Sequence, residues 1–267
     1  MCKKVYNRDF NILRALIRFL RGSFLGSIIG RLKTARLRYV KFRVRYNRDE
    51  LITAHYPYFL QEQRFISALK SNFQFDPEPR VTIEHDWRIH VLCSLALGVV
   101  KGAEGDFIEC GVFRGDCAKT IINYVDLNST NRSFFLLDSF DGFDFSQLTE
   151  KESKLRGEGQ FVGAFEFVTG KFRCDSCVKI IQGFVPNTLD SIANKMFGFA
   201  HIDMNAAYPE KEAFQFIFPR LRDGGVIIFD DYGHAGHEEQ RLALDEVASG
   251  FGRVITCLPT GQGLLIK

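Results

Sequence analysis

The chain has 267 residues, of which 46% are hydrophobic and 25% are charged, and its formal net charge is +3. This composition is typical of an ordinary globular protein and excludes a low-complexity or intrinsically disordered chain. The length suits one α/β domain with extensions.

The charge is unevenly distributed along the chain. Residues 1–48 contain 14 Lys and Arg against the single acid Asp9, a net charge of +13, whereas the rest carries 21 basic and 31 acidic residues, or −10. A basic arm of this kind is expected to meet an anionic surface, either lipid headgroups or the acidic body of the protein itself. Nucleic acid is not expected as a partner, because no basic patch with interspersed aromatic residues recurs near the later motifs.

Within this arm, segment 10–32 has apolar residues at intervals of three and four, the period of an amphipathic helix. The apolar stretch between Arg21 and Arg31 is nine residues long, too short for a membrane span, which needs about 20. Three interpretations remain open. The helix could lie in the headgroup plane at the inner membrane surface, act as a targeting peptide, or dock on the domain or on a second subunit of a homo-oligomer.

The seven cysteines are odd in number and scattered, and no secretory signal peptide precedes them. They are Cys2, Cys93, Cys110, Cys117, Cys174, Cys177 and Cys257. We therefore expect free thiols in a cytoplasmic protein. Cys174 and Cys177 have the spacing of a zinc-binding pair, but a second pair is missing, so ordinary thiols are expected there as well.

Residues 49–103 are predicted to form a helical cap, since the run 87–100 is apolar, ends at Gly102 and follows several prolines. From residue 104 to 267, short β-branched or aromatic runs alternate with helical stretches. The candidate strands are 106–110, 133–138, 178–182, 199–203 and 225–230, with a final pair near 253–258 and 263–266. This alternation predicts an α/β fold with a mostly parallel, doubly wound sheet, to which the final pair adds an antiparallel edge.

The first of these strands carries Glu109 next to its last residue and runs into a loop with Gly111 and Gly115, before a helical stretch over 116–125. Glycines let a chain turn tightly and approach a ligand, and a helix start offers unpaired N–H groups. The spacing differs from the three-glycine dinucleotide fingerprint. The second strand ends in Asp138, where an acid can grip the hydroxyls of a ribose, although it could also cap a turn. Together the two features favour a nucleoside ligand.

Three aspartates follow the next strands: Asp203 ends the fourth, and Asp230 and Asp231 end the fifth. The carboxyl ends of neighbouring parallel strands converge on one crevice, and like charges crowded there need a cation or a proton. An all-oxygen cluster suits Mg²⁺. The alternative is that Asp230 and Asp231 only cap the following turn.

The ordered set of motifs resembles the macrocin O-methyltransferase-like (TylF-type) family of class I S-adenosylmethionine-dependent methyltransferases, over residues 104–245. The resemblance rests on Glu109-Cys-Gly-Val-Phe-Arg-Gly115, Asp138-Ser-Phe-Asp-Gly142, Gln182-Gly-Phe-Val-Pro-Asn-Thr-Leu189, the segment from Ile202 and Asp203 to Tyr208, and Gly224-Gly-Val-Ile-Ile-Phe-Asp-Asp-Tyr-Gly233. It implies a Rossmann-like methyltransferase fold.

The resemblance also implies roles for individual residues. Glu109, Gly111 and Gly115 border the methionine part of S-adenosylmethionine and Asp138 binds its ribose. Ser139, Gly183 and Asp203 join them as cofactor-binding residues, and Asp203, Asp230 and Asp231 hold Mg²⁺. The family tends to read Asp-Gly-Asp where this chain has Asp203-Met204-Asn205. Neutral Asn205 can coordinate or hydrogen-bond but cannot act as a base.

The implied reaction moves a methyl group onto a hydroxyl of a sugar or a glycosylated small molecule. Because such a hydroxyl is a poor nucleophile at neutral pH, Mg²⁺ would lower its pKa and a nearby base would take its proton. Asp203, His234 and His237 are the candidate catalytic residues, since imidazole titrates near neutral pH; His201 is expected to be a packed strand residue.

The Phe- and Gly-rich segment 145–172 predicts a lid over the acceptor, with Phe161, Phe165 and Phe167 as apolar walls, or else ordinary core packing. Two other functions remain open. The acceptor could be a catechol-like phenol, which also presents two vicinal oxygens to a metal ion. Alternatively, Asn205 and the basic arm could mark a degenerate methyltransferase fold that serves as a binding or scaffolding module.

Overall fold

The computed structural model describes residues 44–75 and 85–267. Its contacts divide the chain into two compact units, 1–47 with 52–56 and 48–51 with 57–267. In the first unit, the Arg45 guanidinium lies 5.5 Å from the ring centroid of Tyr56. The predicted amphipathic helix in segment 10–32 and most of the basic arm lie outside the described residues.

The second unit contains a seven-stranded sheet in the order β5-β4-β3-β6-β7-β9-β8. The strands are β3 (Asp106–Cys110), β4 (Phe134–Asp138), β5 (Val178–Gln182), β6 (Phe197–Ile202), β7 (Leu221–Phe229), β8 (Thr256–Cys257) and β9 (Gly263–Ile266). From β5 to β7 every neighbouring pair is parallel, whereas β9 runs antiparallel to β7 and β8 antiparallel to β9. The predicted α/β sheet with an antiparallel edge is confirmed.

Two strands begin earlier than the sequence predicts. β6 starts at Phe197 and β7 at Leu221, and their register shifts between Phe197 and Phe199, where β7 advances from Leu221 to Val226. The extra β7 residues include Gly224, whose φ is +75°. The residues just before the predicted strand start at 225 are therefore an irregularity inside β7, because glycine allows the backbone to bulge without ending the strand.

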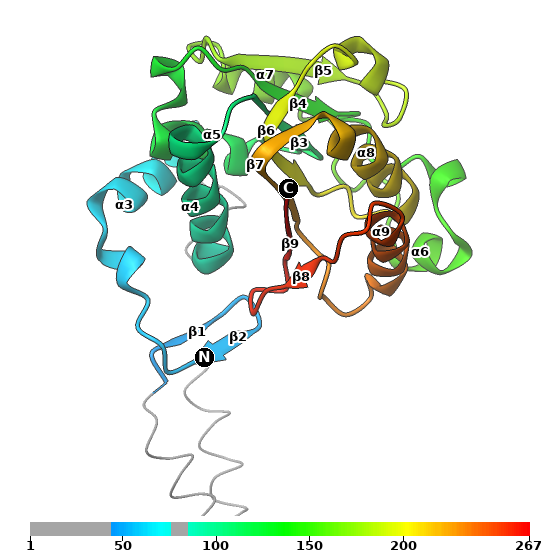
Figure 1. The fold of residues 1–267 in the computed structure, drawn as a ribbon, viewed down its shortest axis with the longest axis horizontal. Helices are drawn as coiled ribbons and strands as arrows, with labels where there is room; N and C mark the ends of the chain where they lie inside the picture. Colours follow the sequence, from blue (N-terminus) through cyan, green and yellow to red (C-terminus); the bar gives the residue numbers. More distant parts are fainter. Residues whose placement is uncertain (1–43, 76–84) are drawn as a thin grey trace, which may run out of the picture. The chain divides into compact units, whose positions relative to one another are not determined.

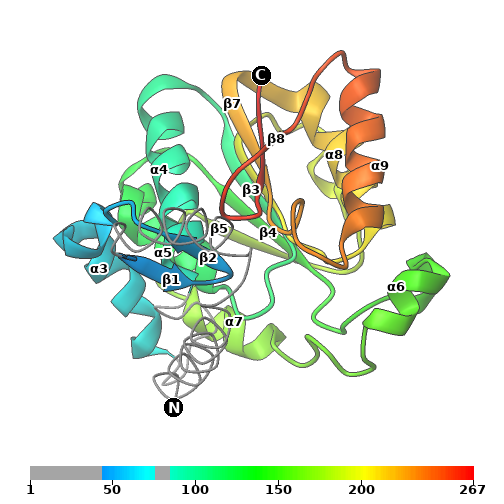
Figure 2. The ribbon, with the colours of Figure 1, turned by 90° about the horizontal axis from the view of Figure 1, so that it is seen from below.

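Helices cover both faces of the sheet (Figures 1 and 2). On one face lie α3 (Gln63–Lys70), α4 (Asp86–Gly102) and α5 (Asp116–Val125), and on the other lie α8 (Ala207–Arg220) and α9 (Glu238–Gly250). Short 3₁₀ turns flank them: η1 (Tyr58–Gln61), η2 (Ser71–Gln74), η4 (Leu127–Ser129) and η6 (Leu189–Ile192). The predicted helical cap differs at its start, where β1 (Tyr46–Arg48) and β2 (Leu51–Thr53) form a separate two-stranded sheet. The two turn residues of this hairpin, Asp49 and Glu50, have φ of 48° and 57°.

The hydrophobic core is divided by the sheet. Successive strand residues point to opposite faces, so Phe107 belongs to the cluster that packs α3, α4 and α5, whereas its neighbour Ile108 belongs to the cluster that packs α8 and α9. Both side chains are fully buried. Packing on both faces fixes the sheet, and the carboxyl ends of its parallel strands lie together at one edge.

The Phe- and Gly-rich segment contains η5 (Phe145–Gln147), α6 (Glu150–Leu155) and α7 (Phe165–Lys171). α6 begins with a reciprocal capping box between Thr149 and Glu152, which satisfies N–H groups at the helix start. Of the three Phe predicted to line an acceptor site, Phe161 lines the cavity described below. Phe167 packs against the core instead, and Phe165 is 36% exposed.

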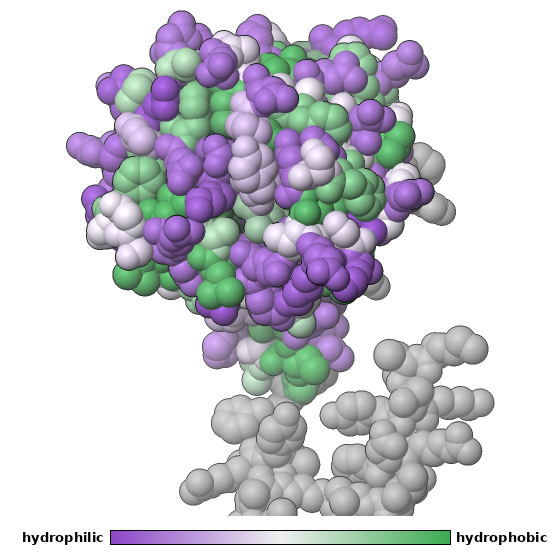
Figure 3. All heavy atoms as spheres, turned by 90° about the vertical axis from the view of Figure 1, so that its right-hand side faces the viewer, coloured by the Kyte–Doolittle hydropathy of each residue, from purple (hydrophilic) through white to green (hydrophobic). Residues whose placement is uncertain are grey.

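The six cysteines among the described residues are free thiols, as the sequence predicts. No helix in the described ranges has both the length and the apolar character that crossing a bilayer requires. On the face shown in Figure 3, hydrophilic side chains are interspersed among apolar ones.

Candidate active site

A cavity opens at the carboxyl ends of the parallel strands, where sequence-distant loops meet. It is lined by Glu109, Gly111, Val112, Phe113, Arg114, Asp116, Cys117, Leu137, Asp138, Ser139, Gly142, Phe143, Asp144, Gln147, Leu148, Phe161, Gly183, Phe184, Val185, Asp203, Met204, Asn205, Ala206 and Pro209. Six of the seven predicted cofactor residues are among them; the exception is Gly115, which lies between the lining residues Arg114 and Asp116. The lining combines apolar and aromatic walls with a few polar groups, as small-molecule sites do.

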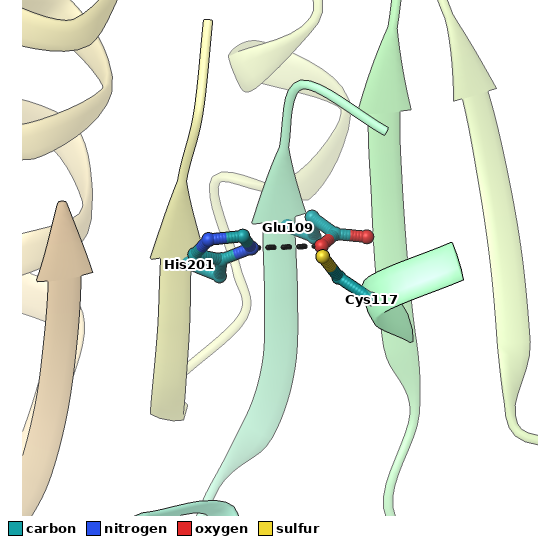
Figure 4. A group of neighbouring side chains, drawn as sticks. All are labelled: Glu109, Cys117 and His201. Carbon is teal, nitrogen blue, oxygen red and sulfur yellow. Dashed lines mark hydrogen bonds and ion pairs between the residues drawn. The ribbon is translucent and has the colours of Figure 1, made fainter. Parts of the chain in front are cut away.

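Glu109 lies at the buried end of β3 and reaches His201 on the neighbouring strand β6 (Figure 4). Its Oε1 is 2.8 Å from Nδ1 of His201. Its other oxygen, Oε2, is buried and has no hydrogen-bond partner among the described residues. A buried carboxylate oxygen without a donor is costly, so this atom calls for a ligand that donates.

His201 is fully buried, as predicted, but it is also part of an ionic chain. Its Nε2 is 3.4 Å from Oδ1 of Asp230, so both ring nitrogens face carboxylates. Burial alone would lower the pKa of His201, but the hydrogen bonds and charges of Asp230 and Glu109 outweigh burial and hold it well above the usual value. The imidazolium therefore compensates part of the buried negative charge.

Cys117 on α5 brings its sulfur near Glu109 and His201 (Figure 4). The possible ligand atoms of the three residues all lie within 4.8 Å of one another. Burial, reinforced by the charge of Glu109, raises the pKa of the Cys117 thiol well above its ordinary value. The thiol stays protonated and is a neutral part of the cavity wall, since only a thiolate binds metal well.

Backbone conformation and steric contacts explain why the predicted positions carry glycine. Gly111 has a φ of +88°, and a Cβ there would overlap the backbone carbonyl of Asp203. At Gly115 the φ is +71°, and a Cβ would press on the ring of Phe172; Gly183 has a φ of +141°. Gly111 thus brings the glycine loop directly beside the end of β6, which places Asp203 next to the loop.

Asp138 at the end of β4 fixes the same loop. Its Oδ2 accepts the N–H groups of Val112 and Phe113, each at 2.7 Å, and its Oδ1 accepts the N–H of Phe140 at 2.7 Å. Ser139 donates its hydroxyl to the carbonyl of Gly142 at 2.9 Å. Asp138 lines the cavity where a ribose is expected, and it also orders the loop that forms the opposite wall.

Asp203 lies on the cavity wall and is contacted by the residue that departs from the family motif. The side-chain amide of Asn205 donates to Oδ1 of Asp203 at 3.0 Å. Burial, with the charges of Asp230 and Asp231, raises the pKa of Asp203 well above its usual value. Asn205 itself has a φ of +57°, and its carbonyl accepts from Arg156 Nε at 2.9 Å.

Asp230 is not among the cavity-lining residues, and both of its carboxylate oxygens accept hydrogen bonds from protein donors. Its Oδ1 accepts from Gln262 Nε2 at 3.0 Å and faces His201, while its Oδ2 accepts from Arg88 Nη1 at 2.7 Å. Burial alone would raise the pKa of Asp230, but Arg88 and His201 hold it well below the usual value. Asp230 is a stably charged carboxylate.

Arg88, in the first turn of α4, belongs to this site although the sequence did not single it out. Its side chain is 12% exposed, and it forms a fork with Asp49, from Nε at 3.1 Å and Nη2 at 3.2 Å. Its Nη1 also lies 3.5 Å from Oδ1 of Asp231. The available signal was a single cationic residue inside the apolar run 87–100.

The two histidines predicted as bases are not among the cavity-lining residues. Nε2 of His234 is 2.7 Å from Arg88 Nη2, so the guanidinium donates to that nitrogen. Nδ1 of His237 is 2.6 Å from Oε1 of Gln240 and 3.6 Å from Oδ2 of Asp231. Their catalytic roles stay predictions.

The residues predicted to hold Mg²⁺ do not fit a magnesium site. Among the described residues, the ligand atoms that cluster are those of His201, Asp203 and Asp230, without Asp231. Both nitrogens of His201 face carboxylates, and both oxygens of Asp230 accept from protein donors. Mg²⁺ demands near-octahedral oxygen ligands at about 2.0–2.1 Å, and the protein's own donors already contact both oxygens of Asp230.

The chain is similar in sequence and in fold to known methyltransferases. A curated relative, 8-demethyl-8-(2,3-dimethoxy-alpha-L-rhamnosyl)-tetracenomycin-C 4'-O-methyltransferase of Streptomyces olivaceus, is 26% identical over 144 residues, 50% of this chain and 55% of the relative. The match thus spans about half the length of that protein.

Solved structures share the fold. The O-methyltransferase NovP has a TM-score of 0.64 at 19% identity, covering 78% of this chain and 98% of NovP. CalS11, a calicheamicin methyltransferase, has a TM-score of 0.57 at 16% identity, covering 83% of this chain and 96% of CalS11. The model of the macrocin-O-methyltransferase (TylF) family matches residues 51–247. This match covers the described helices α3 and α4, the parallel strands and the whole cavity, and the chain belongs to the macrocin-O-methyltransferase (TylF) family.

Proposed function

We propose that this chain is an S-adenosylmethionine-dependent O-methyltransferase whose acceptor is a hydroxyl of a sugar or a glycosylated small molecule. The observation that carries the proposal is the buried Oε2 of Glu109, which has no partner among the described residues and belongs to a side chain on the cavity wall. Family membership supports the reaction class. The curated relative, whose name describes methylation of a rhamnosyl tetracenomycin, supports the acceptor class.

The residues present fit the cofactor. Glu109 Oε2 suits the ammonium of its amino-acid part, because a charge-assisted bond satisfies a buried carboxylate oxygen. Asp138 and Ser139 line the position expected for the ribose, and Phe143 and Phe161 supply aromatic surface for the adenine. When bound, S-adenosylmethionine supplies an electrophilic methyl group on a sulfonium.

Asp203 is the proposed general base. It lies on the cavity wall beside the glycine loop, where an acceptor hydroxyl can approach it. Its raised pKa makes the carboxylate a better proton acceptor than an exposed aspartate, since a base works best when its pKa is near the operating pH. The amide of Asn205 holds Oδ1 by donating to it, which orients the carboxylate and leaves proton uptake to Asp203 alone.

The enclosed shape of the cavity also assists the reaction, because it positions the reacting atoms. Methyl transfer from a sulfonium to an oxygen needs the three reacting atoms in line. Arg156, which bonds Asn205 and lies 5.9 Å from the ring centroid of Phe143, connects the acceptor side to the aromatic wall. A cavity with fixed walls positions the hydroxyl and keeps water from competing.

The test is a pair of measurements on the full chain. Calorimetric titration with S-adenosylmethionine is expected to show one site, and incubation with glycosylated acceptors is expected to release S-adenosylhomocysteine. Catechols, assayed in parallel, are expected to give no product. Asp203→Asn should keep cofactor binding and lose turnover. A chain that does not bind the cofactor would refute the proposal, and turnover of catechols alone would refute the sugar acceptor.

A further inference from the structure

Arg88 links the first turn of α4 to the end of β7, across 142 residues of sequence. Its guanidinium donates to Asp230 at 2.7 Å, to Asp49 at 3.1 and 3.2 Å and to His234 at 2.7 Å. Every nitrogen of the guanidinium therefore has an acceptor. An arginine with only 12% of its side chain exposed is stable only when it is paired in this way.

The guanidinium contacts two of the three aspartates that the sequence assigned to magnesium. Oδ2 of Asp230 accepts from Arg88 directly, and Oδ1 of Asp231 lies 3.5 Å from the same nitrogen. The remaining oxygens of these two residues face Gln262 and His237. A divalent cation on the Asp230–Asp231 pair would have to displace Arg88 or sit against its positive charge.

The neighbouring hairpin turn reinforces this arrangement. Asp49, in a left-handed conformation at the turn between β1 and β2, presents both carboxylate oxygens to the Arg88 fork. A planar guanidinium held bidentately on one side is oriented toward its other acceptors. Arg88 is therefore fixed in place over the aspartate pair by a residue outside the predicted metal set.

A chain of hydrogen bonds connects Arg88 to the wall of the cofactor cavity. Arg88 holds Asp230, Asp230 faces His201, and His201 contacts Glu109 on the cavity wall. A charge fixed at Arg88 thus helps to hold Oε1 of Glu109 on His201, while Oε2 keeps no partner among the described residues. Arg88 acts through these residues and is a positioning residue.

We propose that Arg88 is a built-in cation that replaces the divalent metal at Asp230 and Asp231, so that methyl transfer by this chain requires no magnesium. The part of this inference that concerns turnover rests on the proposed function. The part that concerns metal binding does not, and it can be tested without an acceptor.

The first experiment measures metal binding by titrating the full chain with Mn²⁺, followed by electron paramagnetic resonance. Wild type is expected to bind no stoichiometric Mn²⁺. Arg88→Ala, which leaves the aspartates without their cation, is expected to gain one site, at least about tenfold tighter than any wild-type binding. Arg88→Lys keeps the charge and is expected to resemble wild type. Arg241→Ala is the matched control, because it removes an arginine from a half-exposed surface pair with Asp245.

The second experiment measures turnover in EDTA. Wild-type turnover is expected to be unchanged, whereas Arg88→Ala should lose activity and recover part of it when Mg²⁺ is added. Stoichiometric Mn²⁺ binding by wild type, or loss of its turnover in EDTA, would overturn the inference. Should Arg88→Ala fail to fold, the wild-type and Arg88→Lys titrations still decide it. Absence of turnover with every acceptor would refute the proposed function and leave the Mn²⁺ result standing.

Discussion

The amide of Asn205 donates to Oδ1 of Asp203 at 3.0 Å, at the position where the family tends to carry a second acid. A neutral donor there stabilises the charged form of Asp203, although burial and the charges of Asp230 and Asp231 still hold its pKa high. The departure at Asn205 thus leaves one carboxylate to take the proton.

Replacing Asn205 by Asp should raise the pKa of Asp203 further, because a second carboxylate would stand within hydrogen-bonding distance of the first. The base would then be protonated over a wider pH range. We expect the rising limb of the kcat/KM profile to move to higher pH. Asn205→Ala, which removes the donor without adding charge, should move it less, and an unchanged profile in Asn205→Asp would contradict Asp203 as the base.

Glu109→Gln should weaken S-adenosylmethionine binding. The amide can still contact His201, but it offers the ammonium of the ligand no negative charge. Hydrogen bonds to charged groups contribute about 1.5–3 kcal/mol, so calorimetry is expected to show a loss of about tenfold or more in affinity. Cys117→Ala changes a neutral group on the same wall and serves as the control; equal affinities for wild type and Glu109→Gln would argue against the assigned ligand of Oε2.

Gly111→Ala should destabilise the protein by several times more than Gly159→Ala. Both glycines have positive φ, +88° and +77°, so both variants carry the strain of a left-handed alanine, about 1 kcal/mol or more. Only at Gly111 would the added Cβ overlap backbone, whereas at Gly159 no atom lies within 4 Å. Denaturant unfolding measures the free energy of unfolding of each variant. Similar losses in the two variants would show that the close approach of Gly111 to Asp203 is not rigid.

The stability of the fold should fall as pH rises through the titration of Glu210. Burial, with the charge of Asp231, raises the pKa of Glu210 to about 8. Between its ordinary value near 4.5 and about 8, the folded protein holds a proton that the unfolded chain has released, so each pH unit costs on the order of 1 kcal/mol. Above that window the loss is complete.

Glu210→Gln removes this titration and keeps an oxygen for the N–H groups of Met204 and Asn205. Unfolding free energies measured from pH 5 to 9 should therefore decline less steeply in the variant than in wild type. Parallel curves would mean that Glu210 is charged in the folded protein throughout.

Local sequence patterns predicted most of the fold, because strands at 106–110, 178–182 and 263–266 are short runs that contain several apolar residues and alternate with helical stretches. The cavity was predictable for a related reason. Glu109, Asp138 and Asp203 each end a parallel strand, and such ends converge. What the pattern could not reveal is a partner from outside the sheet.

Arg88 is such a partner. It lies in the first turn of a mostly apolar helix, and it meets Asp230 and Asp49 through tertiary packing, which residue spacing in the sequence does not reveal. Three aspartates near one edge of the sheet predicted that a positive charge would lie beside them, since like charges must be compensated. They could not tell a metal ion from a guanidinium supplied by the chain.

The most direct measurement of the central claim is the transfer of a trideuterated methyl group. The full chain is incubated with S-adenosylmethionine labelled on its methyl and with a panel of glycosylated small molecules, and the products are analysed by mass spectrometry and NMR. We expect one labelled methyl on a sugar oxygen with wild type and none with Asp203→Asn. Cofactor binding without label on any sugar, or label transferred by Asp203→Asn at the wild-type rate, would contradict it.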